Sequence, residues 1–380
     1  MIPPTLTTVV TEPLVRNSSR IFGTYPIDTY SHEIRAFGGY WSANFTIHDE
    51  PLDLTWWIQN GLGSDVKVYD DALVPCWVGF IDQLQIKISS LSIVVGPLMD
   101  TANRVVVMYN GIENTEYPAI SIGQIRTAEA NDTTSQTKYG ILPKILSASD
   151  ITEDEGDGYR DTYLEQMKNP KVSTDFNIKR DIQPSVEVSC LGYVHWLDYP
   201  YSDADTGGQA LSSKIIDILS ATPNSAWLPF NTDNIDANAT IVTTEQDDQN
   251  KTGLNIIKSL VALGDSSYNR WLFAIYNDFK AYYHTAPTEV EYQQWLTDPT
   301  AGIFTTSNAL VNPWNVLPGK WIRYPDLAIG SGMTGDLTTK AQYQFIESAK
   351  YTAPWGLQLK GGEVGTLAQR MAQFGLGGTS

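Results

Sequence analysis

Histidine is the side chain best suited to acid–base or metal chemistry near neutral pH, and this chain of 380 residues has four of them. They are His32, His48, His195 and His284. None belongs to a helical H-E-x-x-H pattern or to a closely spaced set of Cys and His, the patterns typical of metal sites. We therefore predict a structural role for each histidine, and we expect no catalytic residue and no metal ligand among them.

A glycine string at residues 330–335 has the spelling of a dinucleotide-binding loop, Gly-Ser-Gly-Met-Thr-Gly. Such a loop binds pyrophosphate when it joins a buried strand to the N-terminus of a helix. Here only residues 327–329 are apolar before the string, and a strand pattern follows Asp336. We interpret the string as a loop and predict no cofactor-binding residue and no cofactor.

Carboxylates leave two alternatives open. Asp203 and Asp205 alternate before two glycines, as at the start of a calcium loop, but the later Glu that completes such a loop is absent. We favour a solvated turn over a metal site at this position. A glycoside hydrolase needs only two carboxylates at the right separation, and among 43 acidic residues the sequence cannot nominate a pair.

Cys76 and Cys190 lie far apart in dissimilar apolar runs, which indicates buried free thiols rather than a disulfide.

The amino terminus has neither a basic region nor an apolar run, so we expect no secretory signal and maturation in a cytosol.

Charge and composition exclude several classes of protein. The chain has 43 acidic and 25 basic side chains, a net charge of −18 that repels phosphate backbones, so sequence-specific nucleic-acid binding is not expected. Hydrophobic residues make up 42% and charged residues 18%, which is typical of a globular protein. No apolar run approaches the ~20 residues of a membrane-spanning helix.

Alternating apolar residues dominate the chain and predict a mainly β fold with α+β insertions. Period-two runs between residues 40 and 109 indicate five or six short strands, interrupted by a short helix after Asp53, and they fit a small barrel. Helical spacing ends at Asn169-Pro170, and two amphipathic helices are predicted over residues 210–220 and 252–263.

A strand is predicted over residues 185–201 with a bulge at Gly192, and an aromatic hairpin over 271–284. Further strands are expected at 320–324, 343–351 and 356–359. We thus expect two small β-barrel-like domains and a central α/β region, divided into an extended N-terminal arm (1–24), a first β-barrel-like domain (25–115), an insertion or linker with a helix (116–180), an α+β region with the second β-barrel-like domain (181–360) and a glycine-rich tail (361–380).

Two blocks of sequence carry a resemblance to a known family. The first contains YSHEIRAFGGYW at 30–41, NGLG at 60–63, VKVYD at 66–70, WVGFID at 77–82 and GPLMDTANRV at 96–105. The second contains RDTYL at 160–164, CLGYVHWL at 190–197 and KIIDIL at 214–219. This order resembles tail hub proteins of tailed bacteriophages, the siphovirus-like relatives of the contractile-tail central hub, over residues 25 to 290.

The resemblance implies a structural virion protein rather than an enzyme. A tail hub is expected to form a homotrimeric ring that joins the tail tube to distal tail, tip or fibre proteins, with DNA only in transit. It implies a location at the virion tail tip and assembly in the host cytoplasm. A receptor- or carbohydrate-binding tip protein remains an alternative because aromatic side chains stack on sugar rings, and a cell-wall glycan hydrolase is a third.

Two acid-rich segments bear on DNA passage. Residues 150–165 hold seven acids and one base, Arg160, and residues 196–250 hold nine acids and one lysine, Lys214. Because like charge shortens the residence of DNA, we expect at least one segment to line the channel of a ring.

Overall fold

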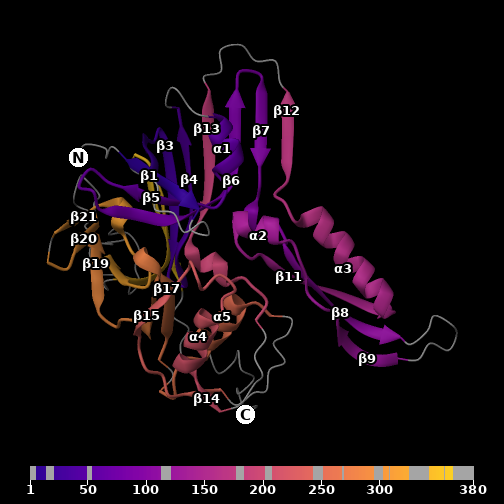
Figure 1. Ribbon diagram of the computed structural model, residues 1–380. Helices are drawn as coiled ribbons and strands as arrows, with labels where there is room; N and C mark the ends of the chain where they lie inside the picture. Colours follow the sequence, from indigo (N-terminus) through magenta and orange to yellow (C-terminus); the bar gives the residue numbers. More distant parts are fainter. Residues whose placement is uncertain are drawn as a thin grey trace, which may run out of the picture.

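The computed structural model describes residues 6–13, 21–48, 54–112, 121–176, 184–201, 208–242, 251–267, 269–294, 303–307, 309–324, 342–354 and 356–362. Strands dominate these residues, so the predicted mainly β class with added helices is confirmed (Figure 1). The helices are α1 (Leu54–Asn60), α2 (Thr133–Tyr139), α3 (Glu153–Met167), α4 (Leu211–Ser220) and α5 (Gly253–Leu263).

One large branched sheet contains 18 of the described strands. They are β1 (Thr7–Pro13), β2 (Ile21–Pro26), β3 (Thr29–Arg35), β4 (Gly38–Ile47), β5 (Ser64–Tyr69), β6 (Pro75–Ile88), β7 (Leu91–Val95), β12 (Val172–Phe176), β13 (Ser185–Leu191), β15 (Asn231–Ile235), β17 (Trp271–Ile275), β18 (Lys280–Thr285), β19 (Val290–Gln294), β20 (Ile303–Thr305), β21 (Leu310–Val311), β22 (Trp321–Tyr324), β23 (Gln342–Thr352) and β24 (Gly356–Gly362).

The large sheet curls along the path β2–β1–β5–β6–β13–β4–β3. A branch through β7 and β12 extends β6, and a second branch runs from β4 through β17 and β18 to β15. The pairing of β3 with β23 joins the C-terminal strands to this path. The strands predicted as two barrel-like units are therefore linked by hydrogen bonds.

The N-terminal segment corrects the prediction of an extended arm over residues 1–24. β1 lies between β2 and β5, and Thr8 and Val10 are completely buried, so its described part belongs to the sheet of its own chain. The Pro- and Thr-rich composition hid the strand, because its buried side chains include a threonine whose hydroxyl reaches the Lys67 carbonyl. Threonine is β-branched and packs well on a pleated sheet.

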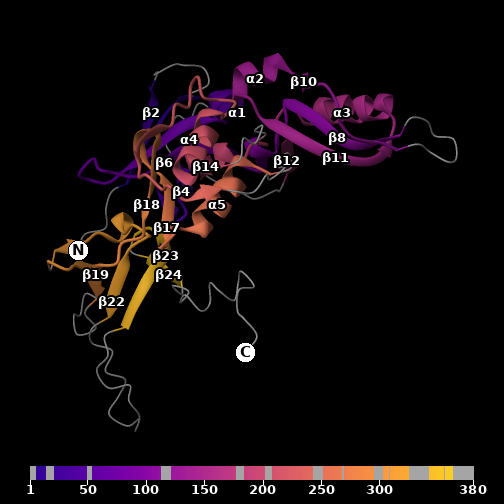
Figure 2. The ribbon, with the colours of Figure 1, turned by 90° about the horizontal axis from the view of Figure 1, so that it is seen from below.

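A separate small sheet carries α3 away from the large sheet (Figures 1 and 2). It consists of β8 (Arg104–Ile112), β9 (Ser121–Arg126), β10 (Ala130–Asn131) and β11 (Pro143–Ile151). We call this sheet with α2 and α3 the arm; the chain enters it after β7 and returns as β12. The short pair β14 (Gln209–Ala210) and β16 (Ile241–Val242) forms a third sheet.

The arm corrects two predictions. The strand at 104–109 was expected in the first barrel, but β8 instead forms the centre of the arm. Residues 116–180 are predicted as an insertion or linker with a helix, yet besides α3 they contain α2 and the strands β9, β10, β11 and β12. The decisive contact is the parallel pairing of β11 with β8, which joins residues about forty positions apart and leaves no local signal. Val105 and Val107 are fully buried in the arm.

Gly192 marks a third correction. The strand predicted to reach Tyr201 ends at Leu191, and the chain continues as the 3₁₀ helix η3 (Tyr193–Leu197). The bulge lies at Ser189–Cys190, opposite β6. A Cβ on Gly192 would lie 1.7 Å from the Tyr40 carbonyl oxygen, so glycine is required for the close approach of two backbones.

Several local predictions are confirmed. The structure has the predicted helices as α1, α4 and α5, and Thr252 caps α5 by accepting a hydrogen bond from the Asn255 amide. The hairpin predicted over 271–284 is β17 and β18. Among the described residues, no helix combines the length and apolar composition needed to cross a bilayer.

A single large core lies inside the curled sheet and under α4 and α5, and it contains Trp57 and Phe80 at 1% exposure each. The C-terminal strands have a smaller cluster of their own, formed by Tyr292, Val316, Ile322 and Ile346. The surfaces described next border the large core.

Candidate functional site

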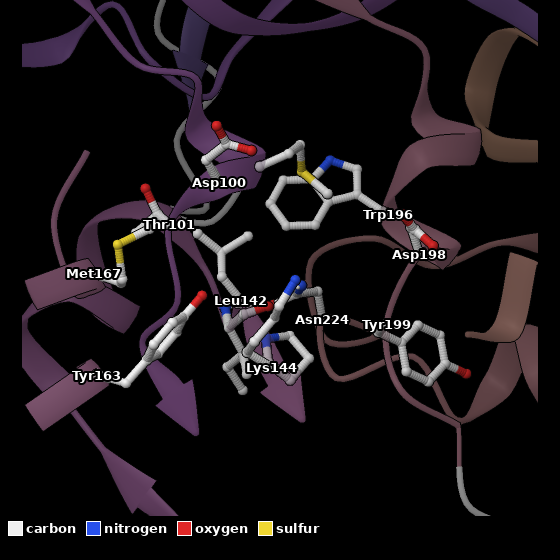
Figure 3. Close-up of a pocket in the computed structure, with 13 residues that line it drawn as sticks. Asp100, Thr101, Leu142, Lys144, Tyr163, Met167, Trp196, Asp198, Tyr199 and Asn224 are labelled. Atoms are coloured by element: carbon white, nitrogen blue, oxygen red, sulfur yellow. Dashed lines mark hydrogen bonds between the residues drawn. The ribbon is translucent and has the colours of Figure 1, made fainter. Parts of the chain in front are cut away.

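A cleft of about 210 Å³ lies where the arm joins the large sheet (Figure 3). The arm supplies Lys144, Tyr163 and Met167, and the segment that follows β13 supplies Trp196 and Asp198 on the facing wall. Chain segments that are distant in sequence form the cleft, because the arm is inserted between β7 and β12.

Two buried asparagines fix the root of the arm beside this cleft. Asn103 donates from Nδ2 to the Gly140 carbonyl at 2.7 Å and accepts the Leu142 amide at 2.8 Å. Asn224 donates to the Ile141 carbonyl and accepts the Ile141 amide, at 2.9 and 2.8 Å, as a neighbouring strand would. Since both side chains are buried and bonded to the backbone of residues 140–142, they fix the position of this segment at the root of the arm.

The polar groups of the cleft differ in their exposure. Asp100, Asp198 and Lys144 are exposed, whereas the indole nitrogen of Trp196 and the hydroxyl of Thr101 are buried without a hydrogen-bond partner among the described residues. Burial raises the pKa of the Asp65 and Asp82 carboxyls, as expected for a general acid, but neither lines the cleft.

Those two carboxyls have structural partners. Asp65 accepts hydrogen bonds from the hydroxyls of Tyr193 and Thr11, and Asp82 accepts the Met99 amide at 2.9 Å at the start of a short 3₁₀ turn. Hydrogen bonds of this kind stabilise the charged form and oppose the effect of burial.

The four histidines do not come together. His32 is 3% exposed beside Tyr30, whose hydroxyl lies 2.9 Å from its Nδ1, and burial lowers the His32 pKa to about 3. His195 donates from Nε2 to the Trp41 carbonyl at 3.1 Å, and burial lowers its pKa to about 4. Both imidazoles are therefore neutral packing groups at pH 7.

His48 lies 3.4 Å from an Asp28 carboxylate oxygen, and His284 donates to the Thr285 carbonyl. In the part of the chain that the structure describes, no three His, Cys, Asp or Glu side chains are grouped as metal ligands. Cys76 and Cys190 are buried free thiols, as expected from the sequence. Asp203, Asp205, the glycine string 330–335 and the tail 363–380 lie outside the described residues.

The branch through β6, β7 and β12 exposes an apolar surface. The alternation of apolar residues in the sequence predicts only part of it. Residues paired directly across strands share a face, and here Phe176 pairs with Leu91, which pairs with Ile88. The next row on this face pairs Thr174 with Ile93 and Ile86. The row after it joins Val172 to Val95, Leu84 and Val188, of which the last three are buried.

This face therefore continues the core of the large sheet until it emerges at β12, where Val172 is 61% and Phe176 is 73% exposed. The opposite face is polar, with Gln85 bonded to Ser92 and Lys87 paired with Glu187. We call Ile88, Leu91, Ile93, Val172 and Phe176 the apolar platform. The sequence alone does not predict the platform, because the whole arm separates β7 from β12 in the chain and only the fold pairs the two strands.

Comparison with known proteins gives structural likenesses only. No protein-family model and no curated protein matches the chain. Among solved structures, the chain is similar to the tail protein from Neisseria meningitidis MC58, with a TM-score of 0.40 and 8% identity over 92% of each chain. It is also similar to the 43 kDa tail protein of prophage MuSo2 from Shewanella oneidensis, with a TM-score of 0.42 and 9% identity over 93% of this chain and 97% of that one.

Proposed function

We propose that this protein is a structural component of a bacteriophage tail, a hub that forms a ring between the tail tube and the tip. The order of its sequence blocks resembles tail hub proteins, and the apolar platform is the structural observation that carries the proposal. An uncovered apolar face at a sheet edge favours association with another chain.

The occupant that we propose for the platform is a neighbouring copy in a homotrimer. β12 pairs only with β7 among the described strands, and all five of its residues are exposed. Burying Val172 and Phe176 would stabilise a contact by about 1.5–3 kcal/mol per side chain. A contact between two different surfaces repeats around an axis and closes a ring.

The acidic charge has a role in this proposal. A ring that passes DNA benefits from a lumen that repels phosphate, since basic side chains there would retain the DNA. The described part of the segment 196–250 includes exposed Asp198, Asp233 and Asp236, while its lysine, Lys214, is 8% exposed and packs against the Tyr201 ring. We propose that this segment faces the channel.

Purified protein tests the proposal by negative-stain imaging and by light scattering over a concentration series. We expect rings with an open centre, and crosslinking on assembled particles should give trimers. Phe176→Ser with Val172→Ser should weaken association, whereas Leu310→Ser, at a 47% exposed position on β21, should not. A monomer in every measurement, including on particles, refutes the ring; mapping a net basic lumen refutes the role of the acids.

A further inference from the structure

A groove of about 580 Å³ crosses the outer face of β3, β23 and β24 beside α5. Its floor is partly apolar, with Phe37, Trp41 and Leu254. The Arg35 guanidinium lies 3.9 Å from the centre of the Trp41 ring, and His195 packs against the same ring. These contacts hold the Trp41 ring in place on the floor.

The rim of the groove is basic in an otherwise acidic chain. Lys258 on α5 and Lys360 on β24 are exposed, and neither forms an ion pair within the described residues. Both acids of the groove are already neutralised: Glu33 pairs with Arg35 at 2.7 Å, and Glu347 pairs with Arg270. The positive charge of the two lysines is therefore available to an acidic partner.

The arm of the same protein has the complementary surface. The outer side of α3 exposes Glu153 and Asp154 in its first turn, and neither forms an ion pair in the described structure. Asp161 lies seven residues beyond Asp154 on the same stripe, but it is paired with Arg160 at 2.8 Å. The basic side chains of α3 and its C-cap are already in ion pairs, Arg160 with Asp157 and Asp161, and Lys168 with Glu165.

We propose that the groove, defined by Trp41, Lys258 and Lys360, binds the acidic outer side of α3 from a second copy of this chain. In Figures 1 and 2, α3 lies on the arm, to one side of α5 and away from β24, so the contact joins two chains head to tail. The proposal rests on the ring of the proposed function and names one of its contacts. It also leaves the segment 196–250 as the acidic lining of the channel.

Charge reversal tests this contact on the full chain. Lys258→Glu with Lys360→Glu should raise the concentration of half-association about tenfold, and Glu153→Lys with Asp154→Lys should do the same. Combining all four changes should restore association to within about threefold of the unchanged protein, because the pairs are reversed together. Lys280→Glu and Glu289→Lys are the matched controls outside the groove, α3 and the segment 196–250, and they should leave association unchanged.

Cysteine crosslinking gives an independent measurement. Asp154→Cys in one preparation and Lys258→Cys in another should form a disulfide-linked dimer when the two are mixed and oxidised, because the proposed contact brings the two positions together. The native thiols Cys76 and Cys190 are buried and should not compete. Asp236→Cys mixed with Lys258→Cys should not.

The outcomes separate this contact from the ring. If both charge reversals leave association unchanged and no crosslink forms, the proposed contact is overturned but the ring is not. If only the lysine reversal weakens association, another acidic segment occupies the groove; if it instead abolishes retention of double-stranded DNA on the protein, the occupant is DNA. Either result overturns the proposal, and a protein that never associates overturns both the contact and the ring.

Discussion

Trp314 donates a hydrogen bond from its indole nitrogen to a carboxylate oxygen of Asp70 at 3.2 Å, although 244 residues separate the two. The other Asp70 oxygen accepts the amides of Ala72 and Val74 and so closes the turn between β5 and β6. Trp314 also packs against Tyr351 on β23. One carboxylate thus joins an N-terminal turn to the C-terminal strands.

Asp70→Ala should lower the free energy of unfolding by roughly 2–4 kcal/mol, because it leaves the buried Trp314 indole without its acceptor and opens the turn. Urea denaturation followed by tryptophan fluorescence measures the change. Asp236→Ala, at an exposed position, is the control and should change stability by less than about 0.5 kcal/mol. An equal, small effect of both substitutions contradicts the structural role of Asp70.

Trp57 and Phe80 anchor the main core, and each is 1% exposed. Truncating either to alanine should cost ~3–5 kcal/mol and prevent tail assembly, because a large cavity replaces the ring. Leu310→Ala, at a 47% exposed side chain, should cost far less. Thermal unfolding and a count of assembled tails measure both effects. A Trp57 variant as stable as the unchanged protein would contradict the proposed role of this ring in the core.

Stability should fall between pH 6.5 and pH 3 through His32. Its pKa is about 3 in the folded protein and near 6.5 in an unfolded chain, so the unfolded chain binds an extra proton throughout this window. This histidine contributes fully above pH 6.5, and its loss by pH 3 is of order 4 kcal/mol. His195, with a pKa of about 4, acts in the same direction.

His32→Asn should flatten this pH dependence, because the asparagine oxygen can replace Nδ1 as a partner of Tyr30 and does not titrate. His284→Asn should keep the slope, since His32 is still present. Urea midpoints at several pH values are the measurement, and an unchanged slope in His32→Asn excludes this histidine as the cause.

Gly192→Ala should destabilise the protein by ~3 kcal/mol, because the new methyl group would meet the Tyr40 carbonyl and force β4 and η3 apart. Gly158→Ala is a matched control within α3, where an added Cβ has no atom within 4 Å. That control should gain up to about 1 kcal/mol from the higher helix propensity of alanine. Equal stability of the two variants contradicts the backbone contact at Gly192.

The purified full-length protein should clear no zone in zymography against host cell wall. We base this expectation on the absence of a catalytic motif in the sequence and on a cleft that contains neither Asp65 nor Asp82, the carboxyls whose pKa is raised by burial. A known lysozyme on the same gel is the positive control. If the protein clears a zone, and if one Asp or Glu substitution abolishes this clearing while the fold stays intact, the protein is a hydrolase.

The elements that sequence reasoning predicted well have local causes. Helix α4 buries a stripe of Leu211, Ile215 and Ile218, and α5 has its cap and its final glycine within the same segment. The hairpin of β17 and β18 pairs neighbours in the chain. Spacing, caps and turns lie within about a dozen residues, so the sequence alone determined these elements, the mainly β class and the acidic charge.

Tertiary structure decided everything that depends on distant partners. β1 became a buried strand because β2 and β5 flank it, and β8 left the first set of strands because β11 pairs with it in parallel. The apolar platform and the groove of Trp41, Lys258 and Lys360 each join segments from separate parts of the chain. Strand pairing and charge neutralisation act between residues brought together by the fold, so no local pattern in the sequence specifies them.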